Sequence, residues 1–377
     1  MLKWIFGLSL LGQAAVASPL NEILTAQYLK KKKSFIYSPL SLDVALSMTA
    51  EGSAGETRKQ FQKVLALPNA EIYKKLNVKS AEYDFVSAQK VWVQSDYPVL
   101  APFEKTLKED YQSTLEKTDF KQNHTKAISN INKWVEEKTR EKIKDLIPPT
   151  GLTPLTRFVL VNAVYFKAKW LSEFDAHSTR ESVFNVNSKD LHIPMMYKRF
   201  HGLKYYEGKG FSSIQLPYQG DDIKFVVFLP KVGGGEFDKN FLKNVLAVKD
   251  SAYSETAVNV EFPKFTTTYS TSVKEDLKVS GLDLPFSKTK ADFSLMSPLV
   301  KTAKERNLYI DKIFHKAFIE VGEKGTEAAA ASAVVMAELG AAMPVDKPKV
   351  FKADHPFLYF IKQKDQILFV GYFAGNK

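Results

Sequence analysis

The stretch that decides the fold reads Glu323-Lys324-Gly325-Thr326-Glu327-Ala328-Ala329-Ala330-Ala331-Ser332-Ala333-Val334-Val335. It follows a run typical of a strand, residues 317–321. Alanine is the best helix former, so a short connecting helix is one interpretation of this stretch. The other interpretation is a strand, in which successive side chains point to opposite faces of a sheet.

As a strand, the stretch has one face made only of small, uncharged side chains. That face consists of Thr326, Ala328, Ala330, Ser332 and Val334. Such a row meets neither a steric nor a desolvation barrier when it enters the middle of an existing sheet. Gly325 supplies a hinge that is free of side-chain restriction. The stretch therefore predicts a loop that can become a central strand.

Helical patterns dominate the first third of the chain, and strand patterns dominate the rest. We expect helices over residues 20–29, over residues 42–50 behind the cap Ser38-Pro39-Leu40-Ser41, after Gly55-Glu56-Thr57, and over residues 128–146. We expect strands over residues 85–93, 158–166, 223–229, 257–265, 314–321, 357–362 and 367–372. Residues 158–166 are apolar almost throughout, which predicts a central strand buried on both faces. Helices first and strands later predict an α+β fold.

The first residues predict export of the chain. Lys3 is the only early charge, an apolar run follows it, and Ala15-Val16-Ala17 is a small-residue cleavage pattern. This arrangement is typical of a secretory signal peptide over residues 1–17, cut after Ala17, rather than of a membrane helix. We expect residues 18–377 to form a single domain, because no repeat or long linker interrupts them. The protein is therefore expected to be secreted and extracellular.

The composition excludes several kinds of chemistry. The chain has no cysteine, which excludes a thiol nucleophile, a zinc–thiolate site and thiol redox chemistry. The formal net charge is +11 over the whole chain. Such a basic secreted protein favours acidic partners, among them sulfated polysaccharide. We expect no nucleic-acid partner, no membrane partner and a monomeric protein.

A search for catalytic motifs finds none. The chain lacks Gly-x-Ser-x-Gly, His-Glu-x-x-His and a phosphate-binding loop. Its six histidines are scattered without metal-ligand spacing. Neighbouring carboxylates such as Glu136-Glu137 diverge on a helix, so they are expected to be solvated. The sequence therefore predicts no catalytic residues, no metal and no cofactor, and it disfavours a secreted hydrolase.

Short motifs follow one another along the chain in a specific order. After Ser38-Pro39-Leu40-Ser41 come Gly52-Ser53-Ala54-Gly55-Glu56-Thr57, residues 160–170, Leu216-Pro217-Tyr218, Phe262-Pro263-Lys264-Phe265, residues 315–321, Asp354-His355-Pro356-Phe357 and Leu368-Phe369-Val370-Gly371. Together with residues 323–332, this order and spacing resemble the serpin family, here an arthropod-type secreted inhibitor. One departure is Arg140-Glu141-Lys142-Ile143, where family members often have glycine before Lys-Ile. The resemblance implies the serpin fold, with three β-sheets, eight or nine helices and an exposed reactive-centre loop.

The resemblance also implies a mechanism of inhibition rather than enzyme activity. A serine protease attacks the exposed loop, and the cleaved loop then inserts into the main sheet and distorts the trapped acyl-enzyme. The residues that match the family's hinge are Glu323, Gly325, Thr326, Glu327, Ala328, Ala329, Ala330, Ala331 and Ser332. The alternative function is a serpin without inhibitory activity, such as a carrier, chaperone or storage protein, although this hinge lacks the bulky or charged residues that such members often have.

The position of the reactive bond depends on the end from which the loop is counted. Counting from Glu323 gives Leu339-Gly340, and counting back from Pro356-Phe357 points nearer to Ala342. We take Leu339-Gly340 as the first choice, with Glu338-Leu339 and Ala342-Met343 as alternatives. Residues 325–346 contain no Lys or Arg. A chymotrypsin-like or elastase-like target is therefore expected.

The resemblance assigns roles outside the loop as well. Ser38, Ser41, Asn162 and His315 match the family's shutter, where the sheet opens, and Trp170 matches its breach, where insertion begins. Ordinary core packing is the alternative for these residues.

Two surface features complete the expectations. A heparin-like polyanion is a candidate activator and partner of the basic residues Lys30, Lys31, Lys32, Lys33, Lys74, Lys75 and Lys79, although a solvated basic face explains them equally well. The sequon Asn123-His124-Thr125 predicts glycosylation of Asn123.

Overall fold

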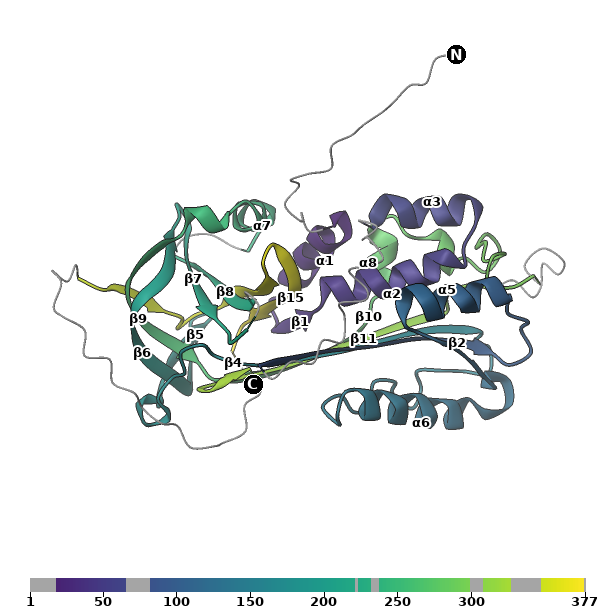
Figure 1. Cartoon of the computed structure of the whole chain (residues 1–377), viewed down its shortest axis with the longest axis horizontal. Coiled ribbons are helices and arrows are strands. Elements are labelled where there is room, and N and C mark those ends of the chain that lie inside the picture. The colour runs from purple at the N-terminus through teal and green to yellow at the C-terminus, as the bar shows by residue number, and fades with distance from the viewer. Residues whose placement is uncertain are drawn as a thin grey trace, which may run out of the picture.

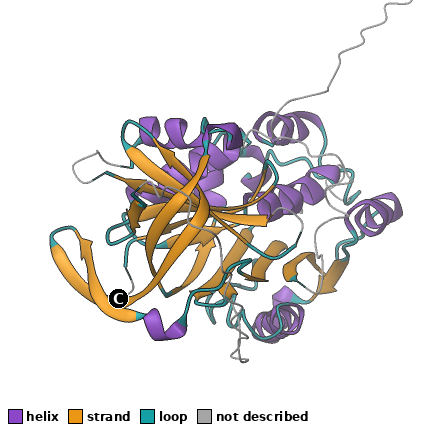
Figure 2. Cartoon of the chain, turned by 60° about the vertical axis from the view of Figure 1, so that its left-hand side comes forward, coloured by secondary structure: helices purple, strands orange, loops and turns teal. Residues whose placement is uncertain are grey.

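The computed structural model describes residues 18–65, 82–220, 223–231, 237–298, 308–326 and 347–375. These residues contain seven α-helices and fifteen β-strands, which confirms the predicted α+β class. Strands form the middle of the molecule, and helices lie above, to the right of and below them (Figure 2). None of the described helices combines the length and the apolar character that a membrane span requires.

The smaller sheet has six strands in the order β10-β11-β12-β4-β2-β3. Its central strand β4 (Phe158–Lys169) is buried along nearly its whole length, as the apolar run in the sequence predicts. On one side β4 pairs antiparallel with β2 (Tyr83–Gln94), and on the other it pairs in parallel with β11 (Lys312–Gly322). The remaining strands are β3 (Leu115–Thr118), β10 (Phe265–Ser272) and the two-residue β12 (Gly325–Thr326).

The larger sheet has nine strands, with the order β1-β15-β14-β8-β7-β6-β9-β13 and β5 paired to β6. The long strand β6 (Lys189–Glu207) pairs with β9 on both sides of a register shift between Phe200 and Leu203. Because β6 continues through this irregularity, two of the three expected sheets form one hydrogen-bonded network in the described residues. Its other strands are β1 (Phe35–Tyr37), β5 (Arg180–Val186), β7 (Phe211–Pro217), β8 (Ile223–Pro230), β9 (Ser254–Pro263), β13 (Lys349–Lys352), β14 (Phe357–Gln363) and β15 (Gln366–Phe373).

Most helices lie on one face of the six-stranded sheet, whereas α6 lies on the opposite face (Figure 1). The buried helix α2 (Pro39–Glu51) begins at the cap Ser38, whose side chain accepts the N–H of Ser41 at 3.1 Å. The helix α1 (Pro19–Lys30) begins in the same way at Ser18, followed by proline in the first turn. The others are α3 (Gly55–Val64), α5 (Ala101–Tyr111), α7 (Lys239–Leu246) and α8 (Lys274–Val279).

The helix α6 (Phe120–Lys138) covers the face of the sheet formed by β2 and β4, and Phe314 of β11 belongs to the same cluster. Its apolar residues Ile128, Ile131 and Val135 pack in one buried cluster with side chains of β4 and with Phe314 of β11. The predicted boundaries 128–146 are wrong at both ends. The helix ends at Lys138, yet Ile143 and Leu146 remain buried in the following segment, which explains why the apolar pattern continues in the sequence.

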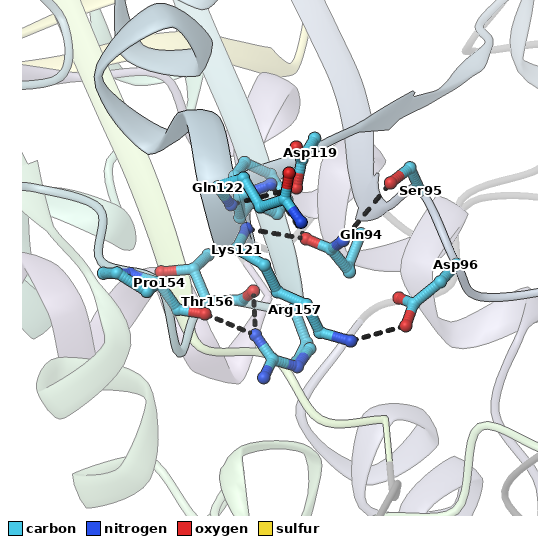
Figure 3. Close-up of polar contacts among 10 residues, drawn as sticks. Gln94, Ser95, Asp96, Asp119, Lys121, Gln122, Pro154, Thr156 and Arg157 are labelled. Carbon is cyan, nitrogen blue, oxygen red and sulfur yellow. Dashed lines mark hydrogen bonds and ion pairs between the residues drawn. The ribbon is translucent and has the colours of Figure 1, made fainter.

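Polar side chains at the end of β2 fasten the first turn of α6 to the sheet (Figure 3). The buried Gln94 accepts the backbone N–H groups of Phe120 and Lys121 at 2.8 and 3.2 Å. Asp119 accepts the N–H of Gln122 at 3.1 Å, and Lys121 pairs with Asp96 at 2.5 Å. These contacts satisfy N–H groups that a helix start otherwise leaves unpaired, and they fix α6 to the end of β2.

Candidate strand-insertion site

The stretch of residues 323–335 contains the start of a strand inside the six-stranded sheet. β4 and β11 pair in parallel from Val159 and Lys312 to Tyr165 and Phe318. Beyond this point the two strands separate, and β12 lies between them, antiparallel to both. Gly325 and Thr326 are therefore already central-strand residues. The hinge residues from Glu327 to Ser332 lie outside the described residues, as do Glu338, Leu339, Gly340, Ala342 and Met343 of the expected reactive bonds.

Gly325 occupies a position that only glycine fits. Its φ of 145° is one that residues with a side chain rarely adopt. A Cβ atom at this position would lie 2.1 Å from the carbonyl oxygen of Ala168, which belongs to the backbone of β4. Glycine thus allows the chain to enter between two strands that leave no room for a side chain.

Thr326 is fully buried and bonded to an aromatic pair. Its hydroxyl lies 2.5 Å from the hydroxyl of Tyr218, and burial raises the pKa of Tyr218 well above its usual range. Tyr218 stacks on Trp170 with ring centroids 4.4 Å apart. The sequence motif Leu216-Pro217-Tyr218 contains this tyrosine, but its role was missed, because its partner is more than 100 residues away in the chain.

Trp170 and the segment after it hold the turn that leads into β12. The indole Nε1 donates to the carbonyl of Gly322 at 2.8 Å, and the backbone N–H of Trp170 donates to Lys324 at 3.0 Å. The N–H of Phe174 donates to the carbonyl of Glu323 at 2.8 Å. The expected breach residue therefore lies directly against the hinge.

Glu323 anchors the other side of this turn. Its carboxylate accepts the Thr179 hydroxyl at 2.9 Å and pairs with Lys264 at 3.0 Å. Burial alone would raise the pKa of this carboxyl group, but hydrogen bonds and the Lys264 charge outweigh burial and lower it. Glu323 is therefore ionised at neutral pH and fixes the point from which the loop departs.

The four expected shutter residues form one buried network centred on Asn162. Its side-chain carbonyl lies 2.6 Å from His315 Nδ1, and its amide donates to the backbone carbonyl and hydroxyl of Ser41 at 3.0 and 2.8 Å. Ser38 accepts the N–H of Ser41 at 3.1 Å. Ser87 also joins, 2.5 Å from the Ser41 hydroxyl, and was missed because a polar residue on a strand carries no signal of its partner.

The contact between His315 and Asn162 crosses the boundary between β11 and β4. These residues face each other in the parallel register of the two strands. Burial lowers the pKa of His315 to about 4, so the imidazole is neutral at physiological pH and donates from Nδ1 to Asn162. A strand that extended β12 further between β4 and β11 would have to separate this pair.

The remaining predicted residues lie away from this site. Lys30, Lys31, Lys32 and Lys33 are exposed at the end of α1 and just beyond it, whereas Lys74, Lys75 and Lys79 lie outside the described residues. Asn123 is exposed in the first turn of α6, where its amide donates to Asp119 at 2.8 Å. In the described part of the chain, no three His, Asp or Glu side chains are placed to hold a metal ion.

Comparisons with known proteins agree with this geometry. Residues 15–375 match the family model described as Serpin (serine protease inhibitor). The chain is 36% identical over 358 residues to an uncharacterized serpin-like protein of Thermococcus kodakarensis, covering 90% of this chain and 80% of that protein. The structure of Serpin48, a highly specific serpin of the insect Tenebrio molitor, is similar with a TM-score of 0.82 at 29% identity, covering 97% of this chain and 100% of that one.

A second structure at this level of similarity is native protease nexin-1 with heparin. Its TM-score is 0.82 at 26% identity, and the match covers 96% of this chain and 98% of that chain. An archaeal protein and an insect protein thus both stand among the relatives. The comparisons support the family and give no support to the narrower arthropod-type assignment.

Proposed function

The chain belongs to the serpin family, and from this premise we propose that it is a secreted suicide inhibitor of serine proteases. The observation that carries the proposal is β12, since Gly325 and Thr326 lie between β4 and β11 as the first residues of a strand. The small, uncharged face continues along the sequence through Val334. The cleaved loop would extend β12 along the same boundary.

Extension of β12 replaces a weaker pairing by a stronger one. β4 and β11 pair in parallel, whereas β12 is antiparallel to both strands. A parallel pair is slightly less stable per residue than an antiparallel pair. Each added residue also gains hydrogen bonds on two sides and buries a small side chain. Separation of His315 from Asn162 is the main local cost along this path.

The loop sequence supports a chymotrypsin-like or elastase-like target. No basic residue occurs between residues 325 and 346, which disfavours a trypsin-like target. We propose Leu339-Gly340 as the bond attacked because counting from Glu323 points to it, with Glu338-Leu339 and Ala342-Met343 as alternatives. The attacked carbonyl carbon forms an ester with the protease serine. Insertion would then carry the protease roughly 50 Å, the length of about 15 residues at 3.3 Å each.

Mass spectrometry of complexes with trypsin, chymotrypsin and elastase tests the proposal. We expect a stable covalent complex with chymotrypsin or elastase, and the C-terminal fragment that separates on denaturation should begin at Gly340. The Leu339→Arg variant should form its complex with trypsin instead. Cleavage without any stable complex across the panel would contradict inhibition and support a carrier, chaperone or storage role.

We also propose that the protein is exported and carries a glycan on Asn123. The side chain is exposed, and its amide keeps one N–H for Asp119 after glycosylation of the nitrogen. N-terminal sequencing of protein from culture medium should give Ser18, and a glycosidase should reduce its mass. Protein retained in cells with residue 1 intact would contradict export.

The exposed lysines after α1 support a sulfated polysaccharide as a partner. Lys30 to Lys33 are consecutive and exposed. Protease nexin-1, a fold neighbour at 26% identity, has a structure with heparin. We expect a heparin column to retain the wild-type protein beyond about 0.3 M salt. Replacement of these four lysines by serine should abolish this retention. Elution of the wild type at lower salt would remove this partner.

A further inference from the structure

A buried carboxylate on α2 takes no part in the hydrogen-bond network of Asn162. Asp43 belongs to α2 and is only 7% exposed. Its two oxygens accept the Ser18 hydroxyl at 3.4 Å and the Asn21 side-chain amide at 3.2 Å. No lysine, arginine or histidine among the described residues forms an ion pair with it. A buried carboxylate is stabilised either by a positive partner or by protonation at a raised pKa.

The hydrogen bonds that Asp43 receives are weak for a charged group. Charge-assisted bonds are usually about 2.7–2.9 Å long, and both distances here exceed that range. Burial raises the pKa of Asp43 to about 7, against the lowering effect of Asn21 and Ser18. The surroundings therefore accommodate the acid but do not fully compensate its charge.

The residue that donates to Asp43 through its amide also has an acceptor without a donor. Asn21 is 4% exposed, and its amide nitrogen is already engaged with Asp43. Its side-chain oxygen, buried in the same place, has no hydrogen-bond partner among the described residues. An acidic acceptor and an unpartnered acceptor on a residue bonded to it could thus both receive a group that has several N–H donors and a positive charge. An ammonium group has both properties.

The chain itself can supply this ammonium group. Ser18 is buried, and its hydroxyl already reaches Asp43. In two of its three staggered rotamers, a serine places its backbone nitrogen about 3 Å from its own hydroxyl oxygen. We propose that the α-ammonium group of Ser18, formed by cleavage after Ala17, binds between Asp43 and the side-chain oxygen of Asn21.

The chemistry of this step is simple hydrolysis. Water cleaves the amide between Ala17 and Ser18, leaving a carboxylate on Ala17 and an amine on Ser18 that takes up a proton. Before cleavage the same nitrogen is a neutral amide with one N–H at most. The cut chain therefore gains a buried ion pair that the uncut chain cannot form, and this pair ties the start of α1 to α2, the helix that begins at Ser38 and carries Ser41.

The inference rests on the proposed export, because export supplies the cut after Ala17. Two recombinant chains, released from a cleavable fusion so that they begin at Ser18 or at Ala17, test the ion pair without export or a protease. Each is prepared as wild type and as Asp43→Asn. The Ser18 chain of the wild type should melt about 5 °C or more above the Ala17 chain. In Asp43→Asn the difference should fall below about 1 °C.

Either of two results would overturn the proposal: equal melting temperatures in the wild type, or the same difference in both backgrounds. A direct measurement covers the case in which Asp43→Asn fails to fold. Periodate cleaves the amino alcohol of an N-terminal serine. It should react at least about 100-fold more slowly with the folded Ser18 chain than with the same chain in guanidinium, and equal rates contradict the pair. Protease assays on the same chains report inhibition separately.

Discussion

At the scale of single residues, two backbone positions with positive φ differ in a revealing way. Gly325 has φ 145° and no room for a Cβ atom, so its glycine is required by the approach of β4. Glu141 has φ 60° in the segment after α6, although it has a side chain. This is where family members often have glycine. The strain at Glu141 is therefore a feature of this chain.

Replacement of Glu141 by glycine should stabilise the protein by about 1 kcal/mol. The left-handed conformation costs a non-glycine residue about 1–2 kcal/mol, and the greater freedom of glycine in the unfolded chain offsets part of the gain. The lost contact with Lys144 is long and exposed, 3.9 Å, so it contributes little. Urea unfolding measures the change.

Arg140 provides the matched control for Glu141. It also has a positive φ, 51°, but its guanidinium donates to both oxygens of Asp84 at 2.6 and 3.3 Å. Arg140→Gly relieves the same backbone strain and removes these bonds. The Arg140→Gly variant should therefore gain no stability over the wild type. A lower stability for Glu141→Gly than for the wild type would contradict the proposed strain at Glu141.

The buried His315, which is bonded to Asn162, predicts how stability depends on pH. The pKa of histidine in an unfolded chain is about 6.5, whereas burial lowers the pKa of His315 to about 4 in the folded protein. Between these values the unfolded chain binds a proton that the folded protein does not. Stability from this group is therefore full above about pH 6.5 and falls as the pH drops toward 4, by about 3 kcal/mol.

Urea unfolding of the wild type and His315→Gln between pH 4 and pH 8 measures this effect. Glutamine cannot titrate, so the variant should lose less stability in acid, and equal acid slopes would contradict the expectation. Variant and wild type must be compared because His355 acts with the opposite sign. Burial lowers the pKa of His355, but Asp354 and the Pro230 carbonyl raise it by more, so the net pKa is raised. The contribution of His355 to stability is therefore present below about pH 6.5 and is lost as the pH rises.

At the scale of elements, local pattern predicts what local residues determine. The apolar run of residues 158–166 identified β4, and the cap Ser38-Pro39 identified the start of α2. The predicted end of α6 was wrong because Ile143 and Leu146 are buried without being helical. The strand β12 exists only because β4 and β11 separate. The two residues of β12 are too few to form a pattern that predicts the gap between β4 and β11.

The expected site residues were assigned through the resemblance and not through a physical pattern. Asn162 and His315 look like isolated polar residues in apolar strands, and only the register of β4 and β11 brings them together. Gln89 illustrates what both approaches missed. Gln89 belongs to β2, lies opposite Asn162 of β4 and accepts the Ser87 hydroxyl at 3.2 Å. Cross-strand partners follow from pairing, which the sequence alone does not specify.

The segment after α6 forms a strap over the boundary where the loop would insert. Arg140 attaches it to Asp84 of β2 on one side, and Lys316 of β11 donates to the carbonyl of Lys144 at 2.5 Å on the other. A new strand adds about 4.8 Å between these attachment points. Both contacts cannot persist unless the strap moves, so they should slow insertion.

Removal of the strap contacts should therefore accelerate inhibition. We expect Arg140→Ala and Lys316→Ala each to form the protease complex several-fold faster, with less inhibitor cleaved without trapping. Lys105→Ala, which removes a long, exposed pair with Glu109 at 4.0 Å on α5, is the control and should have no effect. Unchanged or slower complex formation in both strap variants would show that the contacts do not limit insertion.

At the scale of the whole molecule, one sheet combines strong packing with a boundary that can open. β4 is buried on both faces, but along β11 it has a parallel pairing, a polar network and a helix on the far side. Opening costs the His315–Asn162 contact and part of the packing under α6. Extension of β12 supplies two antiparallel ladders in return. The uncleaved fold should therefore be less stable than the fold with its loop inserted.

Cleavage of the loop by a protease that is not trapped should raise the melting temperature by tens of degrees. The physical reason is the extended β12, which adds a full central strand once the loop is no longer held at both ends. Thr326→Arg is the decisive variant, because Thr326 is fully buried against Tyr218 and a charge there would have no partner. Its loop should be cleaved as readily, but its melting temperature should rise little. Equal melting temperatures for the cleaved and the uncleaved wild type would contradict loop insertion.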